Sequence, residues 1–467
     1  MGRNVLEIIV SNNLCVGCGM CAAICPNNNL KIEFNEFGEY TAVGKDNECP
    51  DTCRMCLTVC PFSESDENED TLAGKLFADP EIKHTPQTGY YLKAFVGHSS
   101  INGHRRNGAS GGMATWLLET LLEKHMVDYV ACVSPAKDAG KLFKFRICTT
   151  AEEIRASSRS YYYPVEASEV TQYILSNEGR YAIIGLPCVC KAIRLATQLN
   201  PKLQHRVKFV LGLTCGQTKS KFFAEYICAL GGGDPKCLEQ FTFRVKEPSR
   251  PASDFGMKFT CRPGKNPPHG GVVFWTEGIE PIWSGRFFTP NACNFCDDVF
   301  AELADICFMD AWLPEYSSDW RGHNIVLVRK NTLAEVLEES IKNGSTSARK
   351  LSITEVIKSQ VGVLRSKRGD MRTRIHLAER NGQIAPKKRL SLCDIKLSFG
   401  RKQLIRAQYL ISQKSREEWV AVKRDLPGFL TKLKPYIIRL RIALFLEKLG
   451  RVPRGIMRRL RRFLMWP

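Results

Sequence analysis

The amino-terminal part of the chain contains two short cysteine runs, Cys15-x2-Cys18-x2-Cys21-x3-Cys25-Pro26 and Cys49-x3-Cys53-x2-Cys56-x3-Cys60-Pro61. Each run closes on a Cys-Pro pair, and the second run has one extra residue between its first two cysteines. Three closely spaced thiolates can turn onto one inorganic cluster, and the proline after the fourth cysteine redirects the chain. The two runs therefore predict a small module that binds metal through thiolates.

The spacing is typical of a bacterial ferredoxin with two 4Fe-4S clusters, in which the fourth cysteine of each run binds the cluster of the other run. On this pattern the first cluster takes Cys15, Cys18, Cys21 and Cys60, and the second takes Cys25, Cys49, Cys53 and Cys56. A disulfide scaffold is disfavoured, because a chain of this length needs no covalent staples and no secretory signal precedes the run. Structural zinc would use CxxC pairs that lie further apart, often with histidine.

Length and composition indicate an ordinary globular protein. The 467 residues, 44% hydrophobic and 25% charged, suggest roughly two to four domains with a sizeable core. The 20 cysteines, without a signal peptide, favour a reducing compartment. No apolar stretch reaches the length of a membrane span. We expect a cytoplasmic protein. We also expect peripheral contact with the inner face of the membrane.

The net charge of +19 is concentrated near the carboxyl end. Residues 401–467 hold 18 Lys plus Arg and 4 Asp plus Glu, which gives +14 and leaves +5 for the rest of the chain.

We expect residues 391–467 to form a basic, amphipathic helical tail. Within Gly455–Trp466, apolar residues share one helical face and four arginines the other, which is typical of an interfacial helix. The alternatives are packing on the protein itself or a partner, or nucleic-acid binding; nothing earlier supports base recognition, so we expect no nucleic acid.

These observations predict an α+β protein of five segments. They are a ferredoxin-type domain with two 4Fe-4S clusters (1–63), an acidic linker (64–90), two parts of a mixed α/β body (91–175 and 176–390) and the basic tail (391–467). The acidic run Glu64–Asp70 is interpreted as solvated linker, with a docking surface for a basic electron carrier as the alternative.

The body begins with a predicted strand at 93–98, a Ser110-Gly111-Gly112 turn, a helix with a broad apolar face and a strand at 129–133. This order is typical of a βαβ unit, and its turn would bring backbone N–H groups to a helix start that suits an anionic group. Such turns also occur with no ligand at all, so both interpretations stay open.

Two further predicted strands each end in a cysteine. Residues 181–188 end at Cys188, with a helix expected to begin near Lys191, and residues 207–215 end at Cys215. Open α/β sheets place ligands beyond the carboxyl ends of their strands, so the two thiols are expected to face one crevice. Cys293-x2-Cys296 lies further along, and this pair alone is compatible with zinc, dithiol redox chemistry or a cluster.

Several motifs together resemble the beta subunit of coenzyme F₄₂₀ hydrogenase/dehydrogenase. They are Ser110-Gly111-Gly112, Gly185-Leu186-Pro187-Cys188, Cys293-x2-Cys296-Asp297, Ala304-Asp305-Ile306 and Asp310-Ala311-Trp312. The resemblance covers about residues 91–370, and a preceding ferredoxin module is a common fusion in that family. It implies an iron-sulfur flavoprotein with bound FAD.

The resemblance also implies site residues. A third 4Fe-4S cluster would be bound by Cys188, Cys215, Cys293 and Cys296, with Cys190 as a neighbour that could replace Cys188. FAD would be contacted by Ser110, Gly111, Gly112, Ser158, Arg159, Ser160 and Tyr161. Arg159 and Ser160 stand where the family frequently has a lysine, which leaves the phosphate contact open. The remaining cysteines are expected to be buried apolar thiols (Cys132, Cys148, Cys228, Cys237, Cys261, Cys307 and Cys393).

The expected function is that of an oxidoreductase in which ferredoxin-type clusters, a body cluster and FAD relay electrons to or from a hydride-type acceptor. Clusters pass single electrons and a hydride carries two, so a flavin is the expected junction. The acceptor would be coenzyme F₄₂₀ or a specialised metabolite, and a redox partner protein or ferredoxin is expected. The alternative is a non-catalytic electron-transfer adaptor that docks on a membrane or a partner enzyme. No catalytic residue is assigned.

Overall fold

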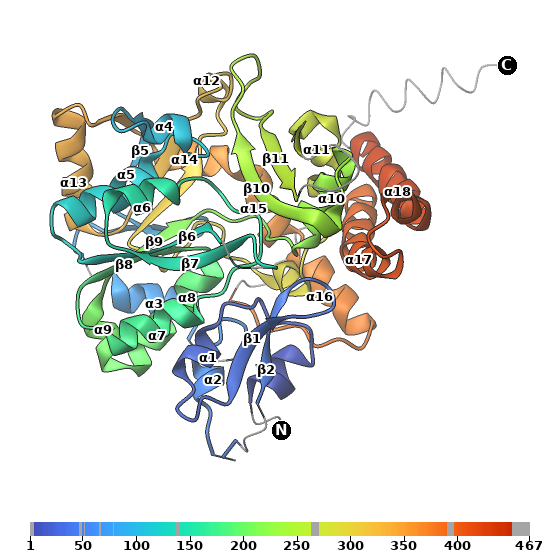
Figure 1. Ribbon diagram of the computed structural model, residues 1–467, viewed down its shortest axis with the longest axis horizontal. Helices are drawn as coiled ribbons and strands as arrows, with labels where there is room; N and C mark the ends of the chain where they lie inside the picture. Colours follow the sequence, from blue (N-terminus) through green and yellow to red (C-terminus); the bar gives the residue numbers. More distant parts are fainter. Residues whose placement is uncertain are drawn as a thin grey trace.

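The computed structural model describes residues 4–45, 49–50, 52–64, 67–77, 79–136, 138, 140–262, 270–389 and 397–450. An eight-stranded mixed sheet with the order β15-β5-β14-β13-β9-β8-β6-β7 lies at its centre (Figure 1). Its strands are β5 (Lys93–Ser99), β6 (Tyr129–Pro135), β7 (Phe143–Cys148), β8 (Tyr181–Gly185), β9 (Val207–Leu213), β13 (Ile306–Asp310), β14 (Asn324–Val328) and β15 (Thr346–Lys350). Strands β6, β8, β9 and β13 run parallel, and β7 and β14 pair antiparallel with them.

Helices cover both faces of this sheet, as Figure 1 shows. On one face α5 (Met113–Glu123) and α13 (Asn331–Lys342) pack against the strands, with Trp116 and Leu333 in the same core as Phe95. On the other face, α7 (Ser168–Ser176), α8 (Pro187–Leu199) and α9 (Pro201–Arg206) bury a second core. Every residue of β8 and β14 is buried, the pattern expected of strands covered on both faces.

The predicted α+β fold is confirmed, with two corrections in the body. The strand expected at 181–188 ends at Gly185, and α8 begins at Pro187 rather than near Lys191. A proline at the first helical position has its φ preset and loses no hydrogen bond, so the apolar run bends into a helix there. Strands β5 and β6 are also not neighbours, because β14, β13, β9 and β8 lie between them.

The ferredoxin module consists of a π-helical turn (Leu6–Val10), α1 (Met20–Ile24), the antiparallel pair β1 (Leu30–Phe34) and β2 (Tyr40–Gly44), and α2 (Met55–Thr58). Its apolar residues join the core of the body, since Ile24 and Val59 belong to the same cluster as Val170. A Cβ added at Gly19, whose φ is +85°, would lie 2.6 Å from a carboxylate oxygen of Glu166. The module therefore packs directly on the body.

The segment expected as an acidic linker contains α3 (Glu69–Leu76) and the hairpin β3 (Lys83–Thr85) and β4 (Gly89–Tyr91). Glu69 is buried and its carboxylate lies 3.2 Å from the Lys191 ammonium. The Arg389 guanidinium lies 2.6 Å from the Asp70 carboxylate. The interpretation of Glu64–Asp70 as a solvated run is therefore wrong for Glu69, which is buried, whereas Asp70 stays exposed although Arg389 pairs with it.

A second layer of structure flanks the sheet. It contains a three-stranded antiparallel sheet of β10 (Leu238–Val245), β11 (Gly256–Cys261) and β12 (Gly270–Phe274). The other helices and helical turns are α4 (His104–Asn107), α6 (Ala151–Ala156), α10 (Phe222–Leu230), η2 (Pro235–Cys237), η3 (Trp275–Glu277), α11 (Ile279–Ser284), η4 (Asn291–Phe295), α12 (Pro314–Ser317), α14 (Ile353–Ser359), α15 (Val361–Leu364), η5 (Arg365–Gly369), α16 (Met371–Arg380), α17 (Phe399–Ala421) and α18 (Leu426–Leu449).

The described part of the basic tail is helical, and it packs on the body. Helices α17 and α18 lie against each other, and Trp419 and Phe429 join a core with Tyr226 and Phe288. The interfacial helix expected at Gly455–Trp466 lies outside the described residues. Within the described part of the chain, no helix is long and apolar enough to cross a membrane.

Candidate redox centre

The eight ferredoxin cysteines lie in two separate pockets. One pocket is lined by Cys15, Cys18, Cys21 and Cys60, together with apolar side chains such as Val5, Ile32 and Phe62. The other is lined by Cys25, Cys49, Cys53 and Cys56. In each pocket the fourth cysteine of one run therefore joins the first three of the other run, which is the grouping that the sequence predicts.

The electrostatics of these thiols fit a cationic occupant. Burial, then the neighbouring Cys15 thiol, raises the pKa of Cys18 to about 12. Burial and the Cys18 thiol likewise raise the pKa of Cys60. Grouped thiolates in an apolar pocket repel one another unless metal ions neutralise them, so these pockets suit iron. Backbone N–H groups add stabilisation, since Gly17 donates to the Cys15 sulfur at 3.4 Å and Asn29 to the Cys25 sulfur at 3.3 Å.

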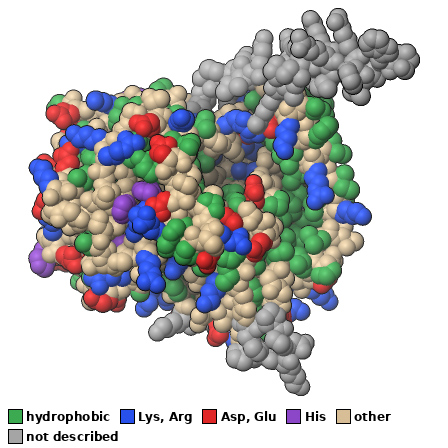
Figure 2. Space-filling view, turned by 90° about the horizontal axis from the view of Figure 1, so that it is seen from above, with side chains coloured by type: hydrophobic (Ala, Val, Ile, Leu, Met, Phe, Trp, Pro, Cys, Tyr) green, Lys and Arg blue, Asp and Glu red, His purple; other side chains and the backbone are tan. Residues whose placement is uncertain are grey.

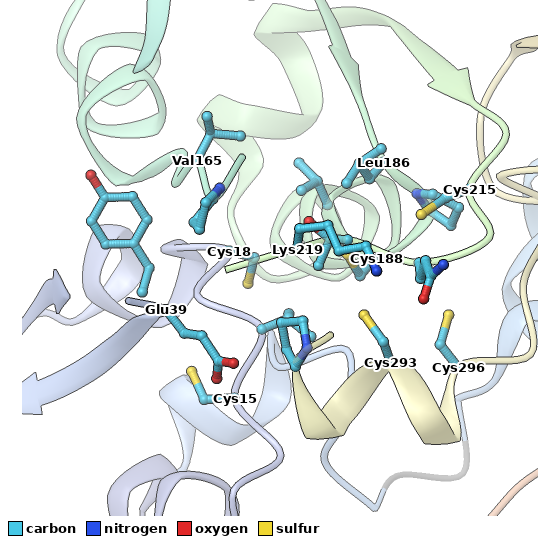
Figure 3. Close-up of a pocket in the computed structure, with 18 of the residues that line it drawn as sticks. Cys15, Cys18, Glu39, Val165, Leu186, Cys188, Cys215, Lys219, Cys293 and Cys296 are labelled. Carbon is cyan, nitrogen blue, oxygen red and sulfur yellow. The ribbon is translucent and has the colours of Figure 1, made fainter. Parts of the chain in front are cut away.

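Four cysteines of the body line a third pocket (Figure 3). Cys188 lies in the first turn of α8, Cys215 follows β9, and Cys293 and Cys296 lie in and just after the turn η4. In Figure 3 the sulfurs of Cys293 and Cys296 point toward Cys188 and Cys215. Burial and the other three thiols raise the pKa of Cys188, and burial raises the pKa of Cys215 to about 12. The structure thus brings together the four residues that the family resemblance implies.

This donor set fits a cluster in which four thiolates share several irons. Within the described ranges, no group of three or more His, Cys, Asp or Glu side chains is placed to hold a single metal ion. Cys190 does not line the pocket, because its sulfur lies 3.6 Å from the carbonyl oxygen of Gly185 and 3.7 Å from that of Leu211. Cys188 is therefore the better match for the cluster.

Buried cations surround this third pocket. The Lys367 ammonium lies 3.1 Å from the Cys296 sulfur and donates to the carbonyl oxygens of Cys215 and Asp298. Lys219 is fully buried, and its ammonium donates to the carbonyl oxygen of Phe287 at 2.7 Å. Burial lowers the pKa of Lys219 well below its usual range. Two buried arginines, Arg286 and Arg374, bind the oxygens of Asn294. The charges of Lys367, Arg286 and Arg374, held in this position, favour an anionic cluster.

A larger cavity of about 460 Å³ lies beside the third pocket, within the size range of cofactor sites. Five of the seven residues expected to contact FAD line it: Ser110, Gly112, Arg159, Ser160 and Tyr161. Gly111 and Ser158 do not. A Cβ at Gly111 would lie 2.6 Å from the carbonyl oxygen of Gly97, so this glycine permits close packing of the turn against β5. Ser158 instead donates to the carbonyl oxygen of Asn107.

The lining of this cavity suits a planar ring with an anionic group. Aromatic side chains contribute to its lining (Tyr162, Phe255, Trp275, Trp283 and Trp312). The Arg244 guanidinium stacks 4.0 Å from the Phe255 ring centre and donates to Asp310 at 2.9 Å. Its Nε is buried and has no hydrogen-bond partner among the described residues. An unpaired guanidinium N–H costs free energy unless a ligand accepts from it, so this arginine favours an anionic ligand.

Sequence reasoning missed Arg244 and Lys367. Each is one basic residue in an ordinary stretch, and the groups that they contact lie far away in the sequence. Trp312 belongs to one of the family motifs, but its place in the cavity follows from the position of β13. No local pattern in the sequence marks any of the three as a site residue.

The third pocket adjoins both the first ferredoxin pocket, lined by Cys15, Cys18, Cys21 and Cys60, and the large cavity. The third pocket is lined by Cys15 and Cys18 of the ferredoxin module as well as by its own four cysteines. Leu186, Cys215 and Gln217 line both this pocket and the large cavity. A continuous series of sites therefore runs from the ferredoxin module to the large cavity.

Comparisons with known proteins agree with this arrangement. Residues 94–172 and 178–353 match the amino-terminal and carboxyl-terminal parts of the coenzyme F₄₂₀ hydrogenase/dehydrogenase beta subunit, and residues 14–63 match a 4Fe-4S dicluster domain. An uncharacterised protein of Methanocaldococcus jannaschii is 25% identical over 46% of this chain, and the chain spans 63% of that relative, less than two thirds of its length.

Two further proteins are similar over a larger part of the chain. One subunit of the F₄₂₀H₂ dehydrogenase of Methanosarcina mazei is 20% identical, over 69% of this chain and 80% of that protein. A chain of the F₄₂₀-reducing NiFe hydrogenase complex from Methanosarcina barkeri is 16% identical, with a TM-score of 0.48 over 66% of this chain and 98% of that one.

Proposed function

Because this chain belongs to the coenzyme F₄₂₀ hydrogenase/dehydrogenase beta-subunit family and carries a 4Fe-4S dicluster domain, we propose that it is an iron-sulfur flavoprotein that exchanges electrons between a protein partner and a hydride-type acceptor. The observation that carries the proposal is the shared lining at Cys215. This residue faces the third thiol pocket and also the large aromatic cavity. A cluster and a flavin held there would be separated by little more than one side chain.

Residues of this chain would hold each group. Three sets of four cysteines would bind the clusters, with Lys367, Arg286, Arg374 and Lys219 around the third set. FAD, when bound, supplies the exchange between single electrons and a hydride. Arg244 and Arg159 would bind its anionic parts, the aromatic side chains would cover its ring system, and Gly112 would allow close approach of the turn before α5.

The acceptor proposed first is coenzyme F₄₂₀, and the second is a specialised metabolite. The name of the Methanosarcina mazei relative, an F₄₂₀H₂ dehydrogenase subunit, supports the first choice. The potentials of protein-bound clusters span roughly −700 to +450 mV depending on their surroundings, so either direction of electron flow is compatible with the site. Because that relative is one subunit of a larger enzyme, its name also favours a protein redox partner.

The test begins with protein reconstituted without oxygen. Three 4Fe-4S clusters require about twelve irons per chain and an equal amount of acid-labile sulfide. The flavin content expected is one FAD per chain. The loaded protein, reduced by an artificial one-electron donor, is then mixed with F₄₂₀, and loss of F₄₂₀ absorbance is followed. Reduction of F₄₂₀ supports the proposal. Full loading with three clusters and FAD but no reduction of F₄₂₀ rejects F₄₂₀ as the acceptor, and a content of about eight irons rejects the third cluster.

A second candidate function is an electron-transfer adaptor without a substrate of its own. One observation favours it: the outer face of α18 exposes Ile438, Ile442 and Phe445, at 47%, 55% and 61%, next to Arg439 and Arg441. Such a face suits a partner or an anionic membrane surface. Turnover of any hydride acceptor by the isolated chain would exclude this candidate.

A further inference from the structure

A second cavity, of about 440 Å³, lies outside the large aromatic cavity, where α4 meets the loop before β14. Its lining includes His98, Arg105, Arg106, Trp320 and Arg321. Figure 2 shows histidine and basic side chains side by side on this face of the molecule. Neither the cysteine pockets nor the expected flavin contacts use any of these five residues.

Positive charge in this cavity exceeds negative charge. The Asp319 carboxylate lies 2.9 Å from both the Arg105 and the Arg321 guanidinium, so one carboxylate forms ion pairs with two guanidinium groups. Arg106 is exposed, and it makes no hydrogen bond or ion pair with the rest of the described chain. Burial, with the repulsion of Arg321, lowers the pKa of Arg105. Gathering three guanidinium groups here costs free energy that an anion would recover.

Two neutral histidines accompany these arginines. The rings of His98 and His323 lie 5.4 Å apart, edge to face, and the Arg105 guanidinium lies 3.1 Å from His323 Nε2. Burial and the Arg105 charge lower the pKa of both histidines to about 4, so both are neutral at pH 7. His98 Nδ1 is buried and has no hydrogen-bond partner among the described residues.

We propose that this cavity binds the oxyanion of a small molecule, a phosphate or a carboxylate, through the Arg105, Arg106 and Arg321 guanidinium groups. The planar fork of arginine matches both oxyanions in two-point geometry, and the Trp320 ring offers an apolar surface beside it. The site is separate from the aromatic cavity but close to it. Ser110, which lines the aromatic cavity, donates to the carbonyl oxygen of His323 at 2.6 Å. The proposal does not depend on whether FAD is bound.

Calorimetry on the full chain with its clusters loaded tests the proposal, with inorganic pyrophosphate and citrate as the two probes. We expect saturable binding of at least one probe at one site per chain, and the tighter probe identifies phosphate or carboxylate chemistry. Sodium chloride at matched ionic strength measures non-specific charge effects.

Arg106→Gln is the main variant. The Arg106 side chain is exposed, and its replacement breaks no hydrogen bond or ion pair within the described chain. It should weaken binding by at least tenfold, whereas Arg146→Gln, at an exposed position on β7, should leave binding unchanged. Arg321→Gln should weaken binding similarly, with folding checked by its thermal transition. Absence of saturable binding of both probes overturns the proposal, and so does equal affinity of the Arg106→Gln and Arg146→Gln variants.

Discussion

The Lys367 ammonium lies 3.1 Å from the Cys296 sulfur, and the lysine is only 2% exposed. It is held there by the π-helical turn Arg365–Gly369 and by the carbonyl oxygens of Cys215 and Asp298. If Cys296 binds the proposed third cluster, a fixed positive charge so near its thiolate stabilises the reduced, more negative form of that cluster. The potential of the third cluster should therefore depend on this lysine.

Replacing Lys367 with methionine should lower the potential of the third cluster, because the cation that favours the added electron is gone. We expect a shift of about 60 mV or more, the one-electron equivalent of a tenfold change in equilibrium constant. Redox titration followed by electron paramagnetic resonance measures it. The two ferredoxin clusters serve as internal references and should keep their potentials. Lys358→Met, at an exposed site on α14, should shift none of the three, and equal potentials in both variants would contradict the role of Lys367.

The assignment of Cys215 is testable by metal content. Cys215→Ala should remove the third cluster, so iron should fall from about twelve to about eight per chain while the ferredoxin signals persist. Cys190→Ala is the matched control, because the Cys190 sulfur faces backbone carbonyl oxygens away from the pocket. Retention of about twelve irons in the Cys215 variant would contradict the assignment of Cys215.

Arg244 should contribute to flavin affinity, because its buried Nε has no partner among the described residues. Arg244→Gln should weaken FAD binding about tenfold or more, since a hydrogen bond to a charged group contributes about 1.5–3 kcal/mol. Quenching of flavin fluorescence gives the affinity. Arg146→Gln should bind FAD as the native protein does, and an unchanged affinity in Arg244→Gln would exclude contact with the flavin.

Arg389 should stabilise the whole fold. It donates to both Glu302 carboxylate oxygens, at 2.8 and 2.6 Å, and it lies 3.3 Å from Asp297. Removing one partner of a buried ion pair leaves uncompensated charge, so Arg389→Met should cost about 3–5 kcal/mol. Lys124→Met, which breaks an exposed pair with Glu339, should cost about 1 kcal/mol at most. Urea denaturation without oxygen compares them, and equal midpoints would show that the buried network is not stabilising.

The exposed face of α18 should matter for surface binding. Figure 2 shows hydrophobic and basic side chains interspersed on the side of the molecule where α18 lies. Ile442→Glu combined with Phe445→Glu should reduce flotation with anionic liposomes several-fold, because both side chains are more than half exposed at 55% and 61%. Removing residues 451–467 tests the predicted interfacial helix separately. If neither change alters flotation, membrane contact through this end of the chain is excluded.

The sequence predicted correctly those features of the site that depend on residues close together in the chain. The grouping of Cys25 with Cys49, Cys53 and Cys56 is that of the two-cluster ferredoxin pattern, in which the fourth cysteine of one run joins the first three of the other. The third set needed the family resemblance, since Cys188 and Cys293 are brought together only by the folded sheet. Its neighbours Lys367 and Arg286 carry no motif, so no part of the sequence indicated their charge at this site.

Errors in the prediction arose where tertiary contacts overrode composition. The acidic run that leads into α3 has the composition of a solvated segment, but Lys191 and Arg389 pair with its end. The apolar run 181–188 has the pattern of one strand, but Pro187 starts a helix. The expected contact of Gly111 with a ligand stays a prediction; Gly111 does not line the large cavity, and its small size lets the turn pack against Gly97.

The ferredoxin module and the body bury their apolar residues in one continuous core. A module fixed in this way cannot swing between a donor and an acceptor as a tethered carrier would. The separation between its clusters and the third cysteine set is then constant, and an electron crosses it by tunnelling through packed atoms. The internal transfer rate should therefore be insensitive to solvent viscosity, and any dependence on viscosity would belong to docking with the partner.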